Sequence, residues 1–140
     1  MNIRPTKITK VLSANDVGET QAHQAGILVP KAPDILGFFP SLDPTLENPR
    51  CTIRVVDQWQ AAWTFAFIYY NNRFRGGTRN EYRLTRMTEF FRSRNVKSGD
   101  SLTLTRSSDL YELSVAKPIG AATPQGQRLK LGTGWKVVEI

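Results

Sequence analysis

The feature that most constrains this chain is the shortness of its apolar segments, which alternate with polar residues or end within a few positions at a turn signal. In "SLTLT", residues 101–105, Leu102 and Leu104 share one face and the hydroxyl side chains share the other. A period of two is typical of β-strands that bury one face. The pattern predicts nine strands: Lys7–Leu12, Gly26–Val29, Cys51–Val56, Trp63–Tyr70, Tyr82–Met87, Ser101–Arg106, Leu110–Ala116, Arg128–Leu131 and Trp135–Ile140.

Two segments favour short helices instead. "APDILGFF", residues 32–39, places Asp34 near a helix start. In "MTEFFRSR", residues 87–94, Met87, Phe90 and Phe91 follow helical spacing. Many strands joined by short turns indicate a mainly β fold that closes, or nearly closes, into a barrel of about seven to nine strands. No repeat or linker interrupts residues 1–140, so we expect a single domain.

Within this barrel, "WTFAFIYY", residues 63–70, is apolar on both faces and is predicted to lie inside the sheet. "PSLDPTLENP", residues 40–49, carries three prolines and is expected to connect elements along the surface. No apolar run reaches the ~20 residues of a membrane-spanning helix, and the amino terminus lacks a secretory signal. Cys51 is the single cysteine, which favours a reducing, cytoplasmic location without an internal disulfide.

A strongly basic segment dominates the charge of the chain. The whole sequence has 19 Lys and Arg against 12 Asp and Glu, a formal charge of +7. Residues 73–94 contain seven arginines, no lysine and two glutamates, so about a sixth of the chain holds +5 of that charge. Arginine presents a planar fork of donors that fits phosphate oxygens or a guanine edge. Gly76 and Gly77 allow a tight turn and a close backbone approach to a ligand.

The order Arg79, Glu81, Arg83 sharpens the prediction, because alternate side chains of an extended segment share a face. Two residues advance roughly 6.8 Å, about two base-pair rises of duplex DNA. Glu accepts a hydrogen bond from the cytosine amino group, and Arg donates to guanine. A simple ion pair between Glu81 and either arginine is the alternative. Asn80 points the other way and is expected to bond its own loop, and Tyr82 is expected to pack at the strand edge.

A second polar segment, "LSANDVGETQAHQAGILVP" at residues 12–30, separates the first two predicted strands. His23 is the single histidine and Cys51 has no spaced partner, so we expect no metal site and no cofactor. A loop histidine of this kind is ordinarily solvated or locally bonded.

Taken together, this segment and "IYYNNRFRGGTRNEYRLTR" at residues 68–86 resemble the amino-terminal DNA-recognition domain of EcoRII-type restriction endonucleases. That family has a DNA-binding pseudobarrel, akin to the plant B-three transcription-factor domains, and two arms that grip the major groove. The resemblance implies double-stranded DNA as the partner and a short G·C-flanked site such as CC(A/T)GG. It places His23 in the first arm, and Arg73, Arg79, Glu81 and Arg83 in the second.

The expected DNA contacts therefore lie in two groups. They are Asn15, Asp16, Glu19, Thr20, Gln21, His23, Gln24, Arg73, Arg75, Gly77, Thr78, Arg79, Asn80, Glu81, Tyr82 and Arg83. The sequence departs from the family where Leu28 replaces a tyrosine and where Gly77 and Tyr82 replace lysines. Arg75 is expected to compensate for one of these losses.

The chain is not expected to be an enzyme, because no Asp-x-Lys or Glu-x-Lys of a PD-(D/E)xK nuclease core occurs in it. A nuclease domain or subunit would then be a further partner. Two alternatives stay open. One is a hydrolase that uses His23 as a base with Asp16 or Glu19. The other is a single-stranded nucleic-acid-binding barrel that stacks bases on aromatic side chains, namely Tyr69, Tyr70, Phe74 and Tyr82.

Overall fold

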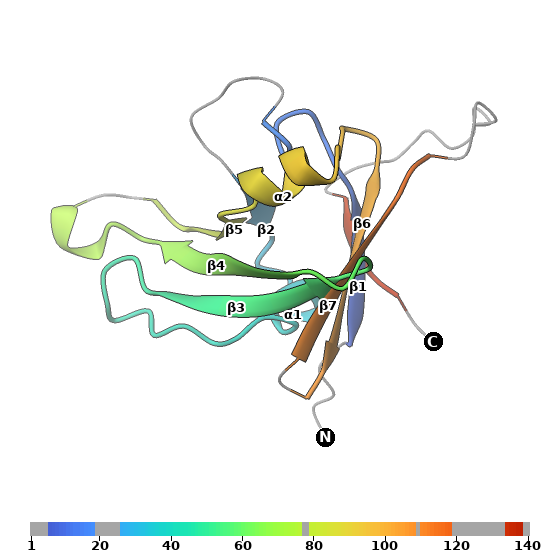
Figure 1. Ribbon diagram of the computed structural model, residues 1–140. Helices are drawn as coiled ribbons and strands as arrows, with labels where there is room; N and C mark the ends of the chain where they lie inside the picture. Colours follow the sequence, from blue (N-terminus) through green and yellow to red (C-terminus); the bar gives the residue numbers. More distant parts are fainter. Residues whose placement is uncertain (1–5, 19–25, 77–78, 109, 119–133, 139–140) are drawn as a thin grey trace.

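A computed structural model describes residues 6–18, 26–76, 79–108, 110–118 and 134–138 of the chain (Figure 1). Two short α-helices are present in this part, α1 (Pro33–Leu36) and α2 (Thr88–Ser93). Eight strands accompany them: β1 (Lys7–Val11), β2 (Ile27–Val29), β3 (Arg50–Asp57), β4 (Ala62–Tyr70), β5 (Glu81–Thr85), β6 (Ser101–Ser107), β7 (Leu110–Ala116) and β8 (Trp135–Val137).

The strands form one sheet in the order β2-β5-β4-β3-β7-β6-β1-β8, which curls into a nearly closed barrel. The β3–β7 pair is parallel and the other pairs are antiparallel. The first and last strands of this order are joined by a side chain, because the Trp135 indole N–H donates to the Leu28 carbonyl oxygen at 2.9 Å. Trp135 is 7% exposed and meets the Phe39 ring edge-on. One indole thus links the two ends of the sheet.

The alternation of the sequence accounts for the core. Leu102 and Leu104 of β6 are fully buried, as predicted. The β4 strand lies between β5 and β3, and its run Phe65–Ile68 is buried, which confirms its predicted place inside the sheet. The helices add Ile35 from α1 and two phenylalanines from α2 to the same hydrophobic cluster.

The predicted element boundaries are confirmed to within a few residues, and β7 matches its prediction. The strand predicted for Tyr82–Met87 instead ends at Thr85, because Arg86 adopts a left-handed backbone with φ of 67° that turns the chain toward α2. The strand predicted for Arg128–Leu131 lies outside the described residues. Neither helix of the described residues is long enough to cross a membrane.

The β3–β4 turn is organised around the buried carboxylate of Asp57. Its oxygens accept hydrogen bonds from the backbone N–H groups of Trp59 and Ala61, from the Trp63 indole at 2.8 Å and from Arg94 Nε at 3.1 Å. Burial opposes ionisation of this group, but the hydrogen bonds from Trp63, the two backbone groups and Arg94 outweigh it and lower the pKa of Asp57. The turn therefore depends on a charged aspartate.

Replacing Trp135 by Phe should lower the free energy of unfolding by about 1–3 kcal/mol, because the Leu28 carbonyl loses its donor. Urea titration measures the change. Trp59→Phe is the matched control, since Trp59 is 48% exposed and should cost less than about 1 kcal/mol. Equal losses in the two variants would show that the indole bond does not hold the sheet ends together.

Replacing Asp57 by Asn should destabilise the protein at neutral pH by roughly 2–3 kcal/mol, because Arg94 loses its charged partner. The pKa of Asp57 is lowered on folding, so its contribution is present above its ordinary value of 3.8 and is lost as pH falls through the folded value. On acidification below about pH 4 the variant should therefore lose less stability than the wild type does, so that the difference between the two proteins shrinks. Thermal melts across pH measure this, with the exposed Asp34→Asn as control; parallel curves for wild type and D57N would contradict it.

Candidate nucleic-acid interface

Two segments lead into paired strands and are named here the first arm, residues 13–26, which precedes β2, and the second arm, residues 71–80, which precedes β5. The strand that follows the first arm pairs with the strand that follows the second, with Ile27 opposite Leu84 and Val29 opposite Tyr82. Gly26 has φ of 99°, and a Cβ on it would lie 2.5 Å from the Leu84 carbonyl oxygen. Only glycine fits this close approach, which seats the end of the first arm against the carboxyl end of β5, whereas the second arm leads into the amino end of the same strand.

The end of the second arm and the start of β5 carry the predicted arginine–glutamate–arginine set on one face. Glu81 Oε2 accepts from Arg79 Nη2 at 2.8 Å and from Arg83 Nε at 2.9 Å. These hydrogen bonds, from Arg83 first and then Arg79, lower the pKa of Glu81 and keep it ionised. The Arg79 guanidinium also lies 4.1 Å from the centre of the Tyr70 ring. The ion pair given as the alternative is therefore confirmed, and it holds both guanidinium groups in place.

Aromatic stacking supports the other face of β5. The rings of Tyr82 and Tyr69 stack at 4.4 Å, and Tyr82 also stacks on Phe67, which in turn stacks on Phe39. Tyr82 thus packs at the strand, as expected. Asn80 Oδ1 accepts from the Tyr69 hydroxyl at 2.7 Å across the strand pair, a contact that the sequence did not predict, and its expected bond to its own loop stays a prediction because residues 77 and 78 lie outside the described residues. Stacking occupies Tyr69 and Tyr82, which disfavours them as base-stacking platforms.

Three asparagines fasten the second arm to the connection before β3. Asn48 Oδ1 accepts from the backbone N–H groups of Asn71 and Asn72, each at 2.8 Å. In return, the Asn48 N–H donates to Asn71 Oδ1 at 2.9 Å. Asn71 also donates from its side chain to the Leu46 carbonyl. The surface connection predicted at residues 40–49 therefore braces the arm, a role that the sequence analysis missed.

The tip of the second arm contains a 3-10 turn at Arg73–Arg75 where the sequence indicated only a loop. Left-handed residues flank it, Asn72 with φ of 46° and Gly76 with φ of 66°. Arg73 is exposed, and Phe74 is 70% exposed. The predicted contacts Gly77 and Thr78 lie outside the described residues.

The first arm begins with a buried ion pair. Asp16 is 8% exposed, and its Oδ2 accepts from Lys10 Nζ at 2.7 Å and from the Ser13 N–H at 2.9 Å. The Asp16 N–H donates back to Ser13 Oγ. The expectation that Asp16 meets DNA is corrected here, since its carboxylate is turned into the protein and anchors the arm. The same pairing leaves it poorly placed to assist a His23-dependent hydrolase.

The remaining first-arm predictions are only partly described. Asn15 is exposed on the turn after Ser13. Five predicted contacts lie outside the described residues, namely Glu19, Thr20, Gln21, His23 and Gln24. Across the described ranges, no group of three His, Cys, Asp or Glu side chains gathers in a way that would hold a metal ion.

Comparison with known proteins identifies relatives of this arrangement. The family model for "Restriction endonuclease EcoRII, N-terminal" matches residues 5–108. The Type II restriction enzyme EcoRII of Escherichia coli is 41% identical over 98 residues, which is 68% of this chain and 24% of that protein. The chain therefore spans about a quarter of the length of this curated relative.

A solved structure, the "Arabidopsis FUS3-DNA complex", matches with a TM-score of 0.60 and 22% identity, over 79% of this chain and 96% of that one. At this identity the match speaks for the fold, and it confirms the pseudobarrel. Together with the family match over most of the sequence, these findings establish that the chain belongs to the EcoRII N-terminal domain family.

Proposed function

We propose that this chain binds double-stranded DNA sequence-specifically by placing its two arms in the major groove. In this proposal it is the target- or effector-recognition domain of a restriction endonuclease. Catalysis belongs to a nuclease domain or subunit, and the chain by itself does not cut DNA. Membership in the EcoRII N-terminal family supports this, as does the fold shared with a plant protein whose structure is titled as a DNA complex.

The observation that carries the proposal is the prearranged set of Arg79, Glu81 and Arg83. Both guanidinium groups are held by one carboxylate oxygen at 2.8 and 2.9 Å, so their donors are oriented before DNA arrives. A purely electrostatic binder gains nothing from an acid within its basic face, because the acid repels phosphate. A base reader gains an acceptor for the cytosine amino group beside two guanine readers.

The spacing of this set suits base pairs that lie two steps apart. Glu81 and Arg83 lie in β5, where two residues advance roughly 6.8 Å, about two base-pair rises. We therefore propose a short G·C-flanked site of the kind CC(A/T)GG. In this mechanism His23 and its polar neighbours read the other part of the site from the first arm, and Arg73 and Arg75 contact phosphates.

Selection of bound duplexes from a randomised oligonucleotide pool tests the proposal. We expect enrichment of one short site with G·C pairs at its flanks. The affinity for that site should fall steeply with salt, since the basic arms release counterions from phosphate. Recovery of no preferred sequence, or a preference for single strands over duplexes, would refute sequence-specific duplex recognition.

Replacing Glu81 by Gln should raise the affinity for random duplexes and reduce the ratio of specific to random binding roughly tenfold or more. The reason is that an anionic charge near phosphate disappears together with the acceptor for cytosine. Fluorescence anisotropy with the selected duplex and a scrambled one measures both affinities.

Glu89→Gln is the matched control, because it removes the same charge from an exposed position on α2. It should leave the ratio unchanged. If the two variants behave alike, Glu81 contributes only charge and an ion pair, and does not read a base.

A further inference from the structure

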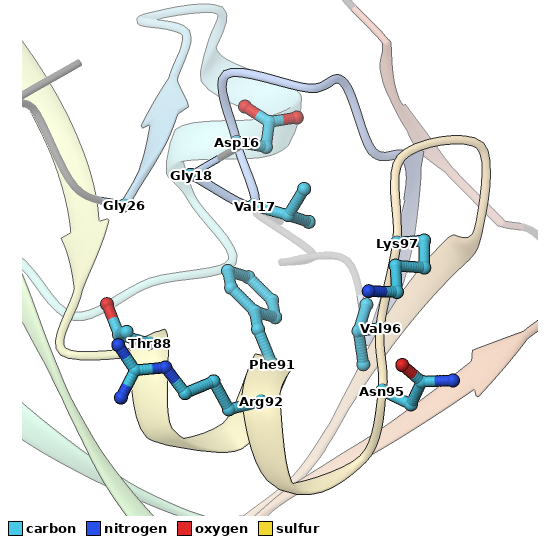
Figure 2. Close-up of a pocket in the computed structure, with 10 residues that line it drawn as sticks. All are labelled: Asp16, Val17, Gly18, Gly26, Thr88, Phe91, Arg92, Asn95, Val96 and Lys97. Atoms are coloured by element: carbon cyan, nitrogen blue, oxygen red, sulfur yellow. The ribbon is translucent and has the colours of Figure 1, made fainter. Parts of the chain in front are cut away.

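A pocket of about 320 Å³ lies between the base of the first arm and α2 (Figure 2). Val17 and Gly18 line it from the first arm. Thr88, Arg92 and Lys97 line it from α2 and the segment that follows. This region is named here the base pocket. It lies at the end of the β2–β5 pair where the first arm enters β2 and β5 leads into α2, which is the end away from the second arm.

Arg92 and Lys97 bring two positive charges to the base pocket. No carboxylate of the described residues forms an ion pair with Arg92 or Lys97. Asp16 also lines the pocket, but Lys10 and the Ser13 N–H engage its carboxylate. Figure 2 shows Arg92 and Lys97 on opposite sides of the Phe91 ring, with the Asp16 carboxylate directed away from them. The pocket thus presents two cations beside apolar surface.

The backbone just before the base pocket has a conformation that is unusual for its residue type. Six non-glycine residues of the described chain have positive φ, and five of them are Asn, Gln or Ser. The sixth is Arg86, with φ of 67°, exposed and two residues before Thr88. An arginine in this conformation costs about 1 kcal/mol or more relative to glycine. The chain thus places a cation just before the pocket despite an unfavourable backbone conformation.

We propose that the base pocket binds a phosphodiester of the DNA backbone, with Arg92 and Lys97 as its cations and Arg86 at its edge. This inference rests on the proposed function. Where an arm enters a groove, its tip reaches the edges of the nucleobases. The part of the arm next to the sheet then meets the sugar–phosphate backbone outside the groove. Arg92 and Lys97 donate to the anionic oxygens, with the Thr88 hydroxyl and the Asn95 amide as further donors. Phe91 and Val17 cover the apolar face of the sugar.

The double variant Arg92→Gln with Lys97→Gln of the full 140-residue chain tests this site. It should bind the selected duplex and a scrambled duplex each roughly tenfold more weakly than the wild type, because a charge-assisted contact is lost. The ratio of the two affinities should stay unchanged, since phosphate carries no sequence information. The slope of log affinity against log salt should fall in magnitude by about 1, as for one phosphate contact.

Arg54→Gln with Lys136→Gln is the matched control, because it removes the same two kinds of cation. Both residues are exposed, on β3 and β8. Thermal melts of both double variants establish that they are folded. Affinity and salt slope equal to those of the control would refute phosphate binding at the base pocket. A changed ratio of the two affinities would also refute it, because such a change would indicate base reading. A wild type that binds no duplex would refute the proposed function and this inference with it.

Discussion

The position of the two arms depends on the antiparallel pairing of β2 with β5, two strands that lie some 50 residues apart in the sequence. The first arm enters β2 opposite the carboxyl end of β5, and the second arm enters the amino end of β5, so the strand pair holds the arms at its two ends. The contact at Gly26 is close because this residue has no side chain, and a Cβ there would meet the Leu84 carbonyl. The Trp135 indole then joins β2 to β8 at the far end of the strand order. Moving either contact would change where the arms leave the sheet.

Glu81 forms the ion pairs that were the alternative to base reading. Its pair with Arg79 is partly exposed, and pairs of this kind contribute only about 0–1 kcal/mol. The exchange of this pair for the base contacts that we propose would therefore cost little. The side chains of Glu81 and Arg79 are about one-third exposed, whereas Arg83 is 13% exposed and more firmly packed. We infer that Arg83 fixes the carboxylate and that Arg79 is the more adjustable of the two arginines.

The sequence predicted the barrel because period-two alternation is a local signal, whereas the two arms were implied by the family resemblance. It did not predict the contacts that position the arms, since these join residues distant in sequence. Asn48 and Asn71 are 23 positions apart, and Trp135 reaches Leu28 over 107 positions. A contact between residues closer in sequence did leave a signal. Lys10 lies on the same strand face as Ile8 and Leu12, both buried, and a lysine on an apolar face requires an acidic partner, here Asp16.

The net charge of the basic segment overstates what is available to DNA. Arg94 is held by the buried carboxylate of Asp57, where it stabilises the β3–β4 turn. Arg79 and Arg83 share Glu81, so that set is nearly balanced and suits recognition more than attraction. In the proposed function, long-range electrostatic attraction of phosphate would then come from arginines without an acidic partner among the described residues, such as Arg86 and Arg92. Affinity and specificity would in this way reside on different side chains, which is why their substitutions are expected to separate the two.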